Sequence, residues 1–221
     1  MITQHKDYIA SLPTEFTVES NTEKTILSDT LNSSNIRVEE NATLTFISFL
    51  TKGWEEVQKL KFTLEGKNSR VLFLCIIFGE KEEGFPYETE SLHLAENTAG
   101  FYHTKSVMGD KSKVNYRGNL IIPKSGQLTD SYLSHDSLML SQEAKVNSIP
   151  CLEIEADDVA AGHAATMGRV DEDMLFYLRS RGIKPKDAKR LLVQGFLGAD
   201  LEKIDSEDIR QLLKQEIEKA I

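Results

Sequence analysis

Cysteine is scarce in this chain of 221 residues, which contains only Cys75 and Cys151. Two thiols are too few for a disulfide framework and too few to supply four thiolate ligands to a cluster within one chain. No apolar run approaches the roughly 20 residues that cross a bilayer. The N-terminus, MITQHKDYIASLP, also lacks the basic start and apolar core of a signal peptide. We therefore expect a cytoplasmic protein with no membrane partner.

Basic residues are fewer than acidic ones: 26 basic and 35 acidic residues give a formal net charge of -9. The average field around such a protein repels the phosphates of nucleic acid. The chain also has no GxxxxGK[ST] loop, the motif that holds nucleotide phosphates at a helix N-terminus. Nucleic acid is therefore not an expected partner, and any ATP hydrolysis would belong to another chain.

Short runs rich in β-branched and aromatic residues predict strands over about residues 36–159. The run Val71–Phe78 has no polar alternation, so both of its faces should be covered, and Cys75 within it is interpreted as a core residue. A turn pattern of a polar residue, Ala or Ser, a polar residue, then Leu or Val begins at Asn41, Asn68, Lys111 and Glu143, at intervals of 27, 43 and 32 residues. A strand solenoid with coils of varying length and a β-sandwich both fit that spacing.

The apolar period becomes helical after Gly168. A first helix is expected after the acidic group Asp171–Asp173 and should end near Gly182. A second should begin at Pro185, with a stripe interpreted as core (Leu191, Leu192 and Phe196), and a third should follow Asp205. Three short amphipathic helices are not stable alone in water, so they must pack together, on the strand domain or on a partner.

The segment Ile149–Gly182, IPCLEIEADDVAAGHAATMGRVDEDMLFYLRSRG, resembles the C-terminal signature of the SufB/SufD iron–sulfur cluster assembly proteins. The similarity starts near Asp130 with TDSYLSHDSLMLSQEAKVNSIPCLEIEADDV. Weaker similarity through SRVLFLCIIFGE and NTAGFYHTKSVMGDKSKVNYRGNLII extends it over roughly residues 36–204. Members of this family are usually longer, so the chain resembles a shortened member.

The resemblance implies a mainly β fold, a right-handed parallel β-helix followed by a small C-terminal α-helical domain. Residues 1–35 would be an N-terminal segment without an assigned structure, residues 36–168 the β-helix domain and residues 169–221 the helical domain. The implied function is a non-enzymatic scaffold for iron–sulfur cluster assembly. Such scaffolds pair through the β-helix, as a homodimer or as a heterodimer with a SufB-like scaffold, and dock the helical domain on a SufC-like ABC-type ATPase. The alternative is a degenerate SufD-like interaction module that binds the ATPase but assembles no cluster.

The resemblance also implies two site residues. His163, in GHAAT, lies where both branches of the family carry a histidine implicated in cluster assembly at the scaffold interface. His135, in SHDS, takes the place of a cysteine thought to hold the nascent cluster in the B-type branch, and imidazole can replace thiolate on iron. Cys151 is a third candidate metal ligand. The cysteine or glutamates that usually accompany His163 are replaced here by Ala161, Gly162 and Ala164.

These residues predict a transient iron–sulfur cluster or iron ion at a dimer interface, with none bound stably by one chain. A structural histidine bonded to the backbone is the alternative for each imidazole. The acidic group Glu153, Glu155, Asp157 and Asp158 is interpreted as a solvated strand edge, with direct metal ligation as its alternative. Lys186, Lys189 and Arg190 are candidates for contact with the ATPase, with solubility as the alternative role. A carbohydrate lyase, the third class considered, lacks a clustered catalytic pair.

Overall fold

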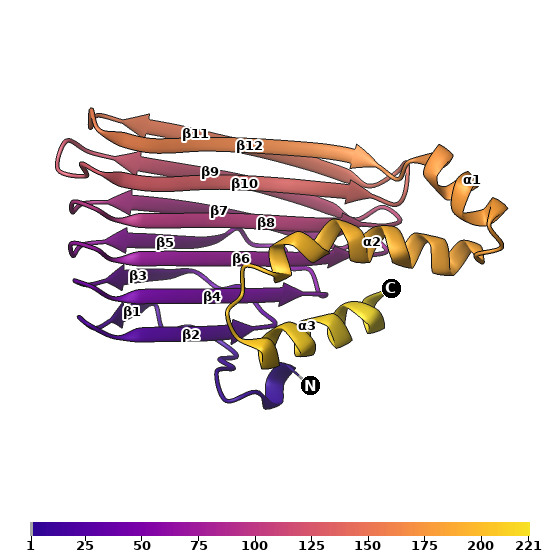
Figure 1. The fold of residues 1–221 in the computed structure, drawn as a ribbon, viewed down its shortest axis with the longest axis horizontal. Helices are drawn as coiled ribbons and strands as arrows, with labels where there is room; N and C mark the ends of the chain where they lie inside the picture. Colours follow the sequence, from indigo (N-terminus) through magenta and orange to yellow (C-terminus); the bar gives the residue numbers. More distant parts are fainter. Residues whose placement is uncertain (1) are drawn as a thin grey trace.

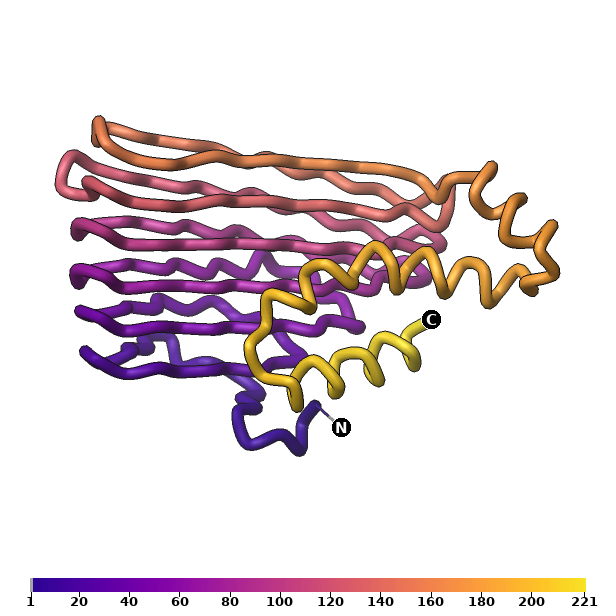
Figure 2. Tube along the Cα trace, in the orientation of Figure 1, coloured from indigo at the N-terminus to yellow at the C-terminus, as the bar shows by residue number. Residues whose placement is uncertain are grey.

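Residues 2–221 are described by the computed structural model, which is drawn in Figure 1. Its strands form one stack of coils, and each coil contributes one strand to each of two sheets. Three helices follow the last coil, and two of them turn back across one sheet (Figures 1 and 2). The parallel β-helix followed by a helical domain, as the family resemblance implied, is therefore confirmed.

The elements alternate regularly along the chain. The first sheet contains β1 (Glu15–Val18), β3 (Ser34–Val38), β5 (Gln58–Leu64), β7 (Gly84–His93), β9 (Lys113–Ile122) and β11 (Lys145–Ile154). The second contains β2 (Glu23–Ser28), β4 (Thr43–Leu50), β6 (Arg70–Gly79), β8 (Ala99–Met108), β10 (Thr129–Met139) and β12 (Val159–Arg169). A short 3-10 helix, η1 (Ile2–Gln4), precedes them, and α1 (Glu172–Ser180), α2 (Pro185–Leu201) and α3 (Glu207–Ala220) follow.

Each strand is hydrogen-bonded to the strands two places away in the sequence, in the orders β1-β3-β5-β7-β9-β11 and β2-β4-β6-β8-β10-β12. Every one of these pairs is parallel. This excludes the β-sandwich alternative, whose strands are antiparallel. The β-helix begins at Glu15, so its first strands lie inside the segment 1–35 that the sequence left unassigned, earlier than residue 36.

Aromatic side chains stack from coil to coil in the interior of the β-helix. Phe46, Phe73, Phe62 and Tyr102 form a continuous series in which successive ring centroids lie 5.3 Å apart. All four side chains are buried. Because burying a large apolar side chain contributes about 1.5–3 kcal/mol, this stack is a main source of stability.

Strand β6 is covered on both faces, as its unbroken apolar run predicted. Phe73 and Cys75 point into the β-helix interior, whereas Leu74 and Ile76 pack against the helical domain on the outer face. Burial raises the pKa of the Cys75 thiol, so this group stays protonated at neutral pH. The interpretation of Cys75 as a core residue is confirmed.

Helix α2 lies on the outer face of the second sheet through Val193 and Leu197, which are buried. The interpretation of Leu191, Leu192 and Phe196 as core is wrong for Leu191, which is 46 % exposed. Apolar residues occur on more than one side of α2, and the sheet buries the side that carries Val193 and Leu197. Helical periodicity therefore predicted the helix but not its buried face.

The residues before β1 cover part of the first coil. The Leu27 N–H donates to the Asp7 carbonyl at 2.9 Å, and the Ile9 N–H donates to the Leu27 carbonyl at 2.8 Å. Leu12 joins the interior cluster, and the Asn32 side chain bonds both its N–H and its carbonyl at 2.9 Å. The backbone of residues 7–12 thus occupies part of the edge of β2 and the end of the interior.

Asparagines stack at the turns that lead from the first sheet to the second. Asn21, Asn41, Asn68 and Asn97 have φ between 54° and 61°, and side-chain hydrogen bonds of 3.0, 2.8 and 2.6 Å join each to the next. Asparagine tolerates this left-handed backbone better than most L-residues. In the following coil Leu128 takes the position, with φ of 59° and a side chain that is 55 % exposed.

The recurring turn pattern of the sequence comes from both ends of the coils. Asn41 and Asn68 belong to the asparagine stack, whereas Lys111 and Glu143 lie in turns at the opposite end. In each copy the small residue that follows is buried (Ala42, Ser69, Ser112 and Ala144). The pattern marks the inside of a tight turn, which explains why its spacing is irregular.

Replacing Leu128 with asparagine is expected to stabilise the protein by about 1 kcal/mol. The new side chain would relieve the cost of leucine in the left-handed region and would donate a hydrogen bond to Oδ1 of Asn97. Urea unfolding measures the gain as a higher midpoint at unchanged slope. Leu128→Gly is the control, because glycine relieves the backbone cost without adding the bond. Equal gains in both variants would show that the side-chain bond contributes nothing.

Candidate functional site

The last coil has no further coil packed on it. Among the described residues β11 pairs only with β9, and β12 only with β10, so each strand has one open edge. Leu152, Ile154 and Met167 lie on the inner face of this coil and are 37, 39 and 44 % exposed. Open strand edges beside apolar side chains form a surface on which another chain can pair.

His163 lies near the middle of β12, on its inner face. Its neighbour in the register is Leu133 of β10, which is fully buried, and neighbouring residues of parallel strands share a face. Because no coil covers β12, the imidazole is exposed. Only the small residues Ala161 and Ala165 flank it on this face, so its own strand does not screen it.

His135 lies on β10 and is 1 % exposed. Its Nε2 lies 3.0 Å from the Oγ of both Ser106 and Ser137, and these two hydroxyl oxygens are 2.6 Å apart. The Tyr116 ring packs edge-on against the imidazole at a centroid distance of 5.3 Å. Within residues 2–221 the buried Nδ1 has no hydrogen-bond partner. A proton on Nε2 can be donated to a serine oxygen, which leaves the Nδ1 lone pair free.

The structure brings His135 and His163 to the same face of adjacent strands and leaves the thiols elsewhere. His135 is aligned with Ala165, two residues along β12 from His163. Cys151 lies in the opposite sheet, aligned with Asn119 on the outer face of β9, and Cys75 is enclosed in the core. The three candidate ligands His163, His135 and Cys151 therefore do not form one site within a single chain.

Acidification from about pH 6.5 to about pH 4 is expected to destabilise the protein. Burial lowers the pKa of His135 from 6.5 to about 4, so the unfolded state binds more protons in this window and the free energy of unfolding falls as pH falls. Burial also lowers the pKa of His93 and of His103 to about 4, which adds to the effect. Urea unfolding at several pH values measures the loss. A wild-type stability that does not change in this window would contradict the prediction, and His135→Asn should weaken the dependence.

The corner between α1 and α2 exposes large apolar side chains. Met174, Phe176 and Tyr177 are 45, 71 and 52 % exposed, and Figure 1 shows α1 projecting beyond the end of the sheets. Exposed basic side chains occur in the same segment: Arg179, Arg181, Lys184, Lys186, Lys189 and Arg190. The start of α1 also exposes Asp171, Glu172 and Asp173, so the corner carries charges of both signs. Exposed aromatic side chains among charged groups have the character of a contact area for a partner.

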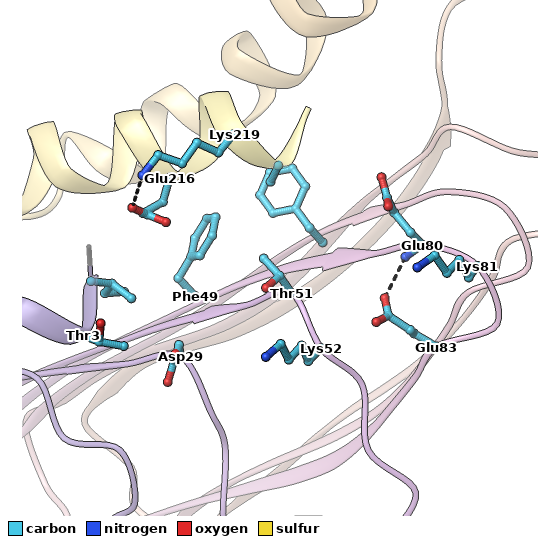
Figure 3. Close-up of a pocket in the computed structure, with 13 residues that line it drawn as sticks. Thr3, Asp29, Phe49, Thr51, Lys52, Glu80, Lys81, Glu83, Glu216 and Lys219 are labelled. Atoms are coloured by element: carbon cyan, nitrogen blue, oxygen red, sulfur yellow. Dashed lines mark hydrogen bonds and ion pairs between the residues drawn. The ribbon is translucent and has the colours of Figure 1, made fainter.

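A pocket of about 590 Å³ lies beside α3, and none of its lining residues is on β10 or β12. Figure 3 shows Phe49 between the helix and the strands, with charged side chains around it. Lys219 Nζ lies 2.8 Å from Glu216 Oε1, and Glu83 Oε2 accepts the Glu80 N–H at 3.1 Å. The lining carries charges of both signs, so it does not favour an anion. It contains no histidine or cysteine, so it does not favour a soft metal ion either.

The acidic group Glu153, Glu155, Asp157 and Asp158 is exposed at every position, which agrees with a solvated edge. Across residues 2–221 no cluster of three or more histidine, cysteine or acidic side chains is arranged to hold a metal ion. In the same part of the chain, no helix combines the length and the apolar character needed to span a bilayer.

Sequence reasoning missed the hydroxyl groups around His135 and the exposure of Phe176. Ser106 and Ser137 occupy inward positions of their strands, where alternation predicts apolar residues. Serine at an inward position beside a histidine was the available signal, because a buried polar group needs a hydrogen-bond partner. Phe176 gave no comparable signal, since an apolar residue in an amphipathic helix is usually buried.

These features define a parallel β-helix protein whose last coil has open strand edges and whose helical domain is folded onto one sheet. The chain belongs to the SufB/SufD family, because the family model described as "SUF system FeS cluster assembly, SufBD core domain" matches residues 17–196. The expected family is thereby confirmed.

Relatives from both branches are similar to this chain. It is 30% identical over 182 residues to the iron-sulfur cluster assembly protein SufD of Escherichia coli. This alignment covers 80% of this chain and 42% of the relative. SufD of Bacillus subtilis is 32% identical to this chain over 146 residues, an alignment that covers 66% of this chain and 33% of the relative. SufB of Bacillus subtilis is 29% identical over 186 residues, which cover 83% of this chain and 40% of the relative. The chain therefore spans less than half the length of these relatives.

Proposed function

We propose that this chain is a scaffold subunit on which iron and sulfide are assembled into a cluster where two last coils meet. Its relatives are named as iron–sulfur cluster assembly proteins. The observation that carries the proposal is the exposed His163 on an uncovered inner face, one strand away from His135, whose Nδ1 has no hydrogen-bond partner within residues 2–221. The cluster is cargo that the scaffold passes on. The second last coil comes from another copy of this chain or from a SufB-like chain.

Pairing through β11 and β12 would cover the open strand edges and the apolar side chains beside them. A two-fold arrangement would place both copies of His163 near one axis, with His135 one strand behind each. Histidine nitrogens serve as iron ligands in Rieske-type centres. A site of neutral imidazoles without a nearby thiolate suits a transient iron ion or a labile cluster better than a stored one.

Changing both His135 and His163 to alanine is expected to lower the iron and sulfide that the anaerobically purified scaffold carries at least about tenfold, because both ligands are lost. Iron and sulfide analysis and transfer to an apo-ferredoxin measure the effect, after co-expression with a SufC-like ATPase and a SufB-like chain. His5→Ala is the matched control, since His5 lies in the N-terminal segment away from β10 and β12. Unchanged iron binding in the double variant would remove the proposal.

A SufC-like ABC-type ATPase is the proposed partner of the helical domain. The sequence has no phosphate-binding loop of its own, and the corner between α1 and α2 offers aromatic and basic side chains such as Phe176 and Lys186. An ATPase that binds two arrangements of the scaffold with different affinity would shift the population between them. This is how nucleotide hydrolysis in one chain would act on a site in another.

Phe176→Ser is expected to weaken binding of the ATPase at least about tenfold, because the most exposed aromatic residue of the corner would lie at the centre of the contact. Co-purification and calorimetry with a SufC-like protein measure the loss. Val57→Ser is the control, since Val57 is 47 % exposed and precedes β5, outside the helical domain. Equal binding by both variants would place the contact elsewhere.

An interaction module that binds the ATPase but assembles no cluster is the second candidate. It is favoured by the position of the thiols, because Cys75 is enclosed in the core and Cys151 lies in the opposite sheet from the histidines. Anaerobic reconstitution with iron and sulfide, followed by an absorption spectrum, separates the two functions. A spectrum that depends on His163 supports the scaffold, and ATPase binding without any iron uptake supports the module.

A further inference from the structure

An ion cluster that is buried at Asp200 and partly exposed at its other end joins the helical domain to the strands around His135. Lys105 Nζ of β8 lies 2.9 Å from Asp136 Oδ2 of β10 and 3.2 Å from Asp200 Oδ2 of α2. Lys203, just after α2, lies 2.6 Å from the other oxygen of Asp200. Asp200 is only 3 % exposed. The ammonium group of Lys105 also lies 4.5 Å from the ring centroid of Phe196, so it contacts α2 twice.

His103 extends this ion cluster along the sheet. Its Nε2 lies 3.3 Å from Lys203 Nζ, and its Nδ1 lies 2.7 Å from Ser134 Oγ of β10. An ammonium group can only donate, so Nε2 accepts and Nδ1 carries the proton that Ser134 accepts. Burial, with the charge of Lys203, lowers the pKa of His103 to about 4, and the ring is neutral at pH 7. Two strands and α2 thus share one hydrogen-bonded network.

Asp200 stays charged although it is buried. Burial alone would raise the pKa of this carboxyl, but the hydrogen bond from Lys203 and the charge of Lys105 hold it below its usual range. A buried carboxylate is tolerated only while its partners remain in contact. A shift of α2 across the sheet would therefore either carry Lys105 with it or leave charges unpaired.

The ion cluster lies directly behind the hydroxyl groups that bond to His135. Lys105 is aligned with Asp136, and Ser106 is aligned with Ser137, on the same two strands. Successive residues of a strand face opposite sides. Single peptide units therefore connect the charged residues of the outer face to Ser106, His135 and Ser137 on the inner face. A displacement of Lys105 or Asp136 changes the positions of the groups around the His135 imidazole.

We propose that this ion cluster is the mechanical link through which the helical domain sets the position of the His135 imidazole, with the buried Asp200 as a positioning residue. The purpose of such a link rests on the proposed function, since an ATPase that moves α2 would thereby act on a side chain next to the last coil. The link itself rests on contacts within this chain, and its test needs neither the ATPase nor iron.

Asp200→Asn removes the charge and keeps the shape of the side chain. NMR of the ¹⁵N-labelled imidazoles reports the tautomer and hydrogen bonding of each histidine. In this variant the signals of His103 and His135 should both shift, and the β10 amides beside His135 should exchange about tenfold faster. Asp187→Asn is the matched control, because Asp187 forms an exposed ion pair with Arg190 on the same helix. It should change neither imidazole.

A shift of His103 alone would overturn the proposal, because the ion cluster would then open without moving His135. Unchanged signals from both histidines would overturn it as well. If Asp200→Asn does not fold, Lys203→Met is measured in the same way with the same outcomes, since that side chain is 42 % exposed and leaves Lys105 with Asp136. If the wild-type protein takes up no iron, the proposed function is contradicted, but the NMR result for the ion cluster still stands by itself.

Discussion

Every strand of a parallel β-helix turns alternate side chains inward, where the opposite sheet and the neighbouring coils cover them. This constraint builds the aromatic stack through Phe46 and Phe73, and it also determines what the last coil exposes. Leu152, Met167 and His163 occupy the positions that are core positions in earlier coils. The surface proposed for pairing is thus made by the same residue pattern as the core.

The same constraint explains how far the sequence predicts the fold. The unbroken apolar run of β6 revealed two covered faces, because one is covered by the opposite sheet and the other by the helical domain. The buried side of α2 could not be chosen, since Leu191 and Val193 are equally apolar and only the shape of the sheet decides between them. The start of the β-helix at Glu15 was also missed, because the first strands are short and partly polar.

For the candidate site, the sequence identified both histidines through a family resemblance but gave no account of their surroundings. The contrast between an enclosed His135 and an exposed His163 depends on which coil is last, a property of the whole stack. The ion pairs of Lys105 with Asp136 and Asp200 depend on a register between β8 and β10 and on a helix that returns over them. Local periodicity predicts neither the register of the strands nor the return of the helix over them.

The two ends of the stack differ in a way that bears on assembly size. At the first coil, the backbone groups of Asp7 and Ile9 already bond to Leu27 of β2, so the chain's own main chain occupies that part of the sheet edge. At the far end, no part of residues 2–221 pairs with the outer edge of β11 or of β12. Subunits joined at their last coils would turn their first coils outward, where the β2 edge is partly occupied, and this disfavours growth beyond two members into a fibre.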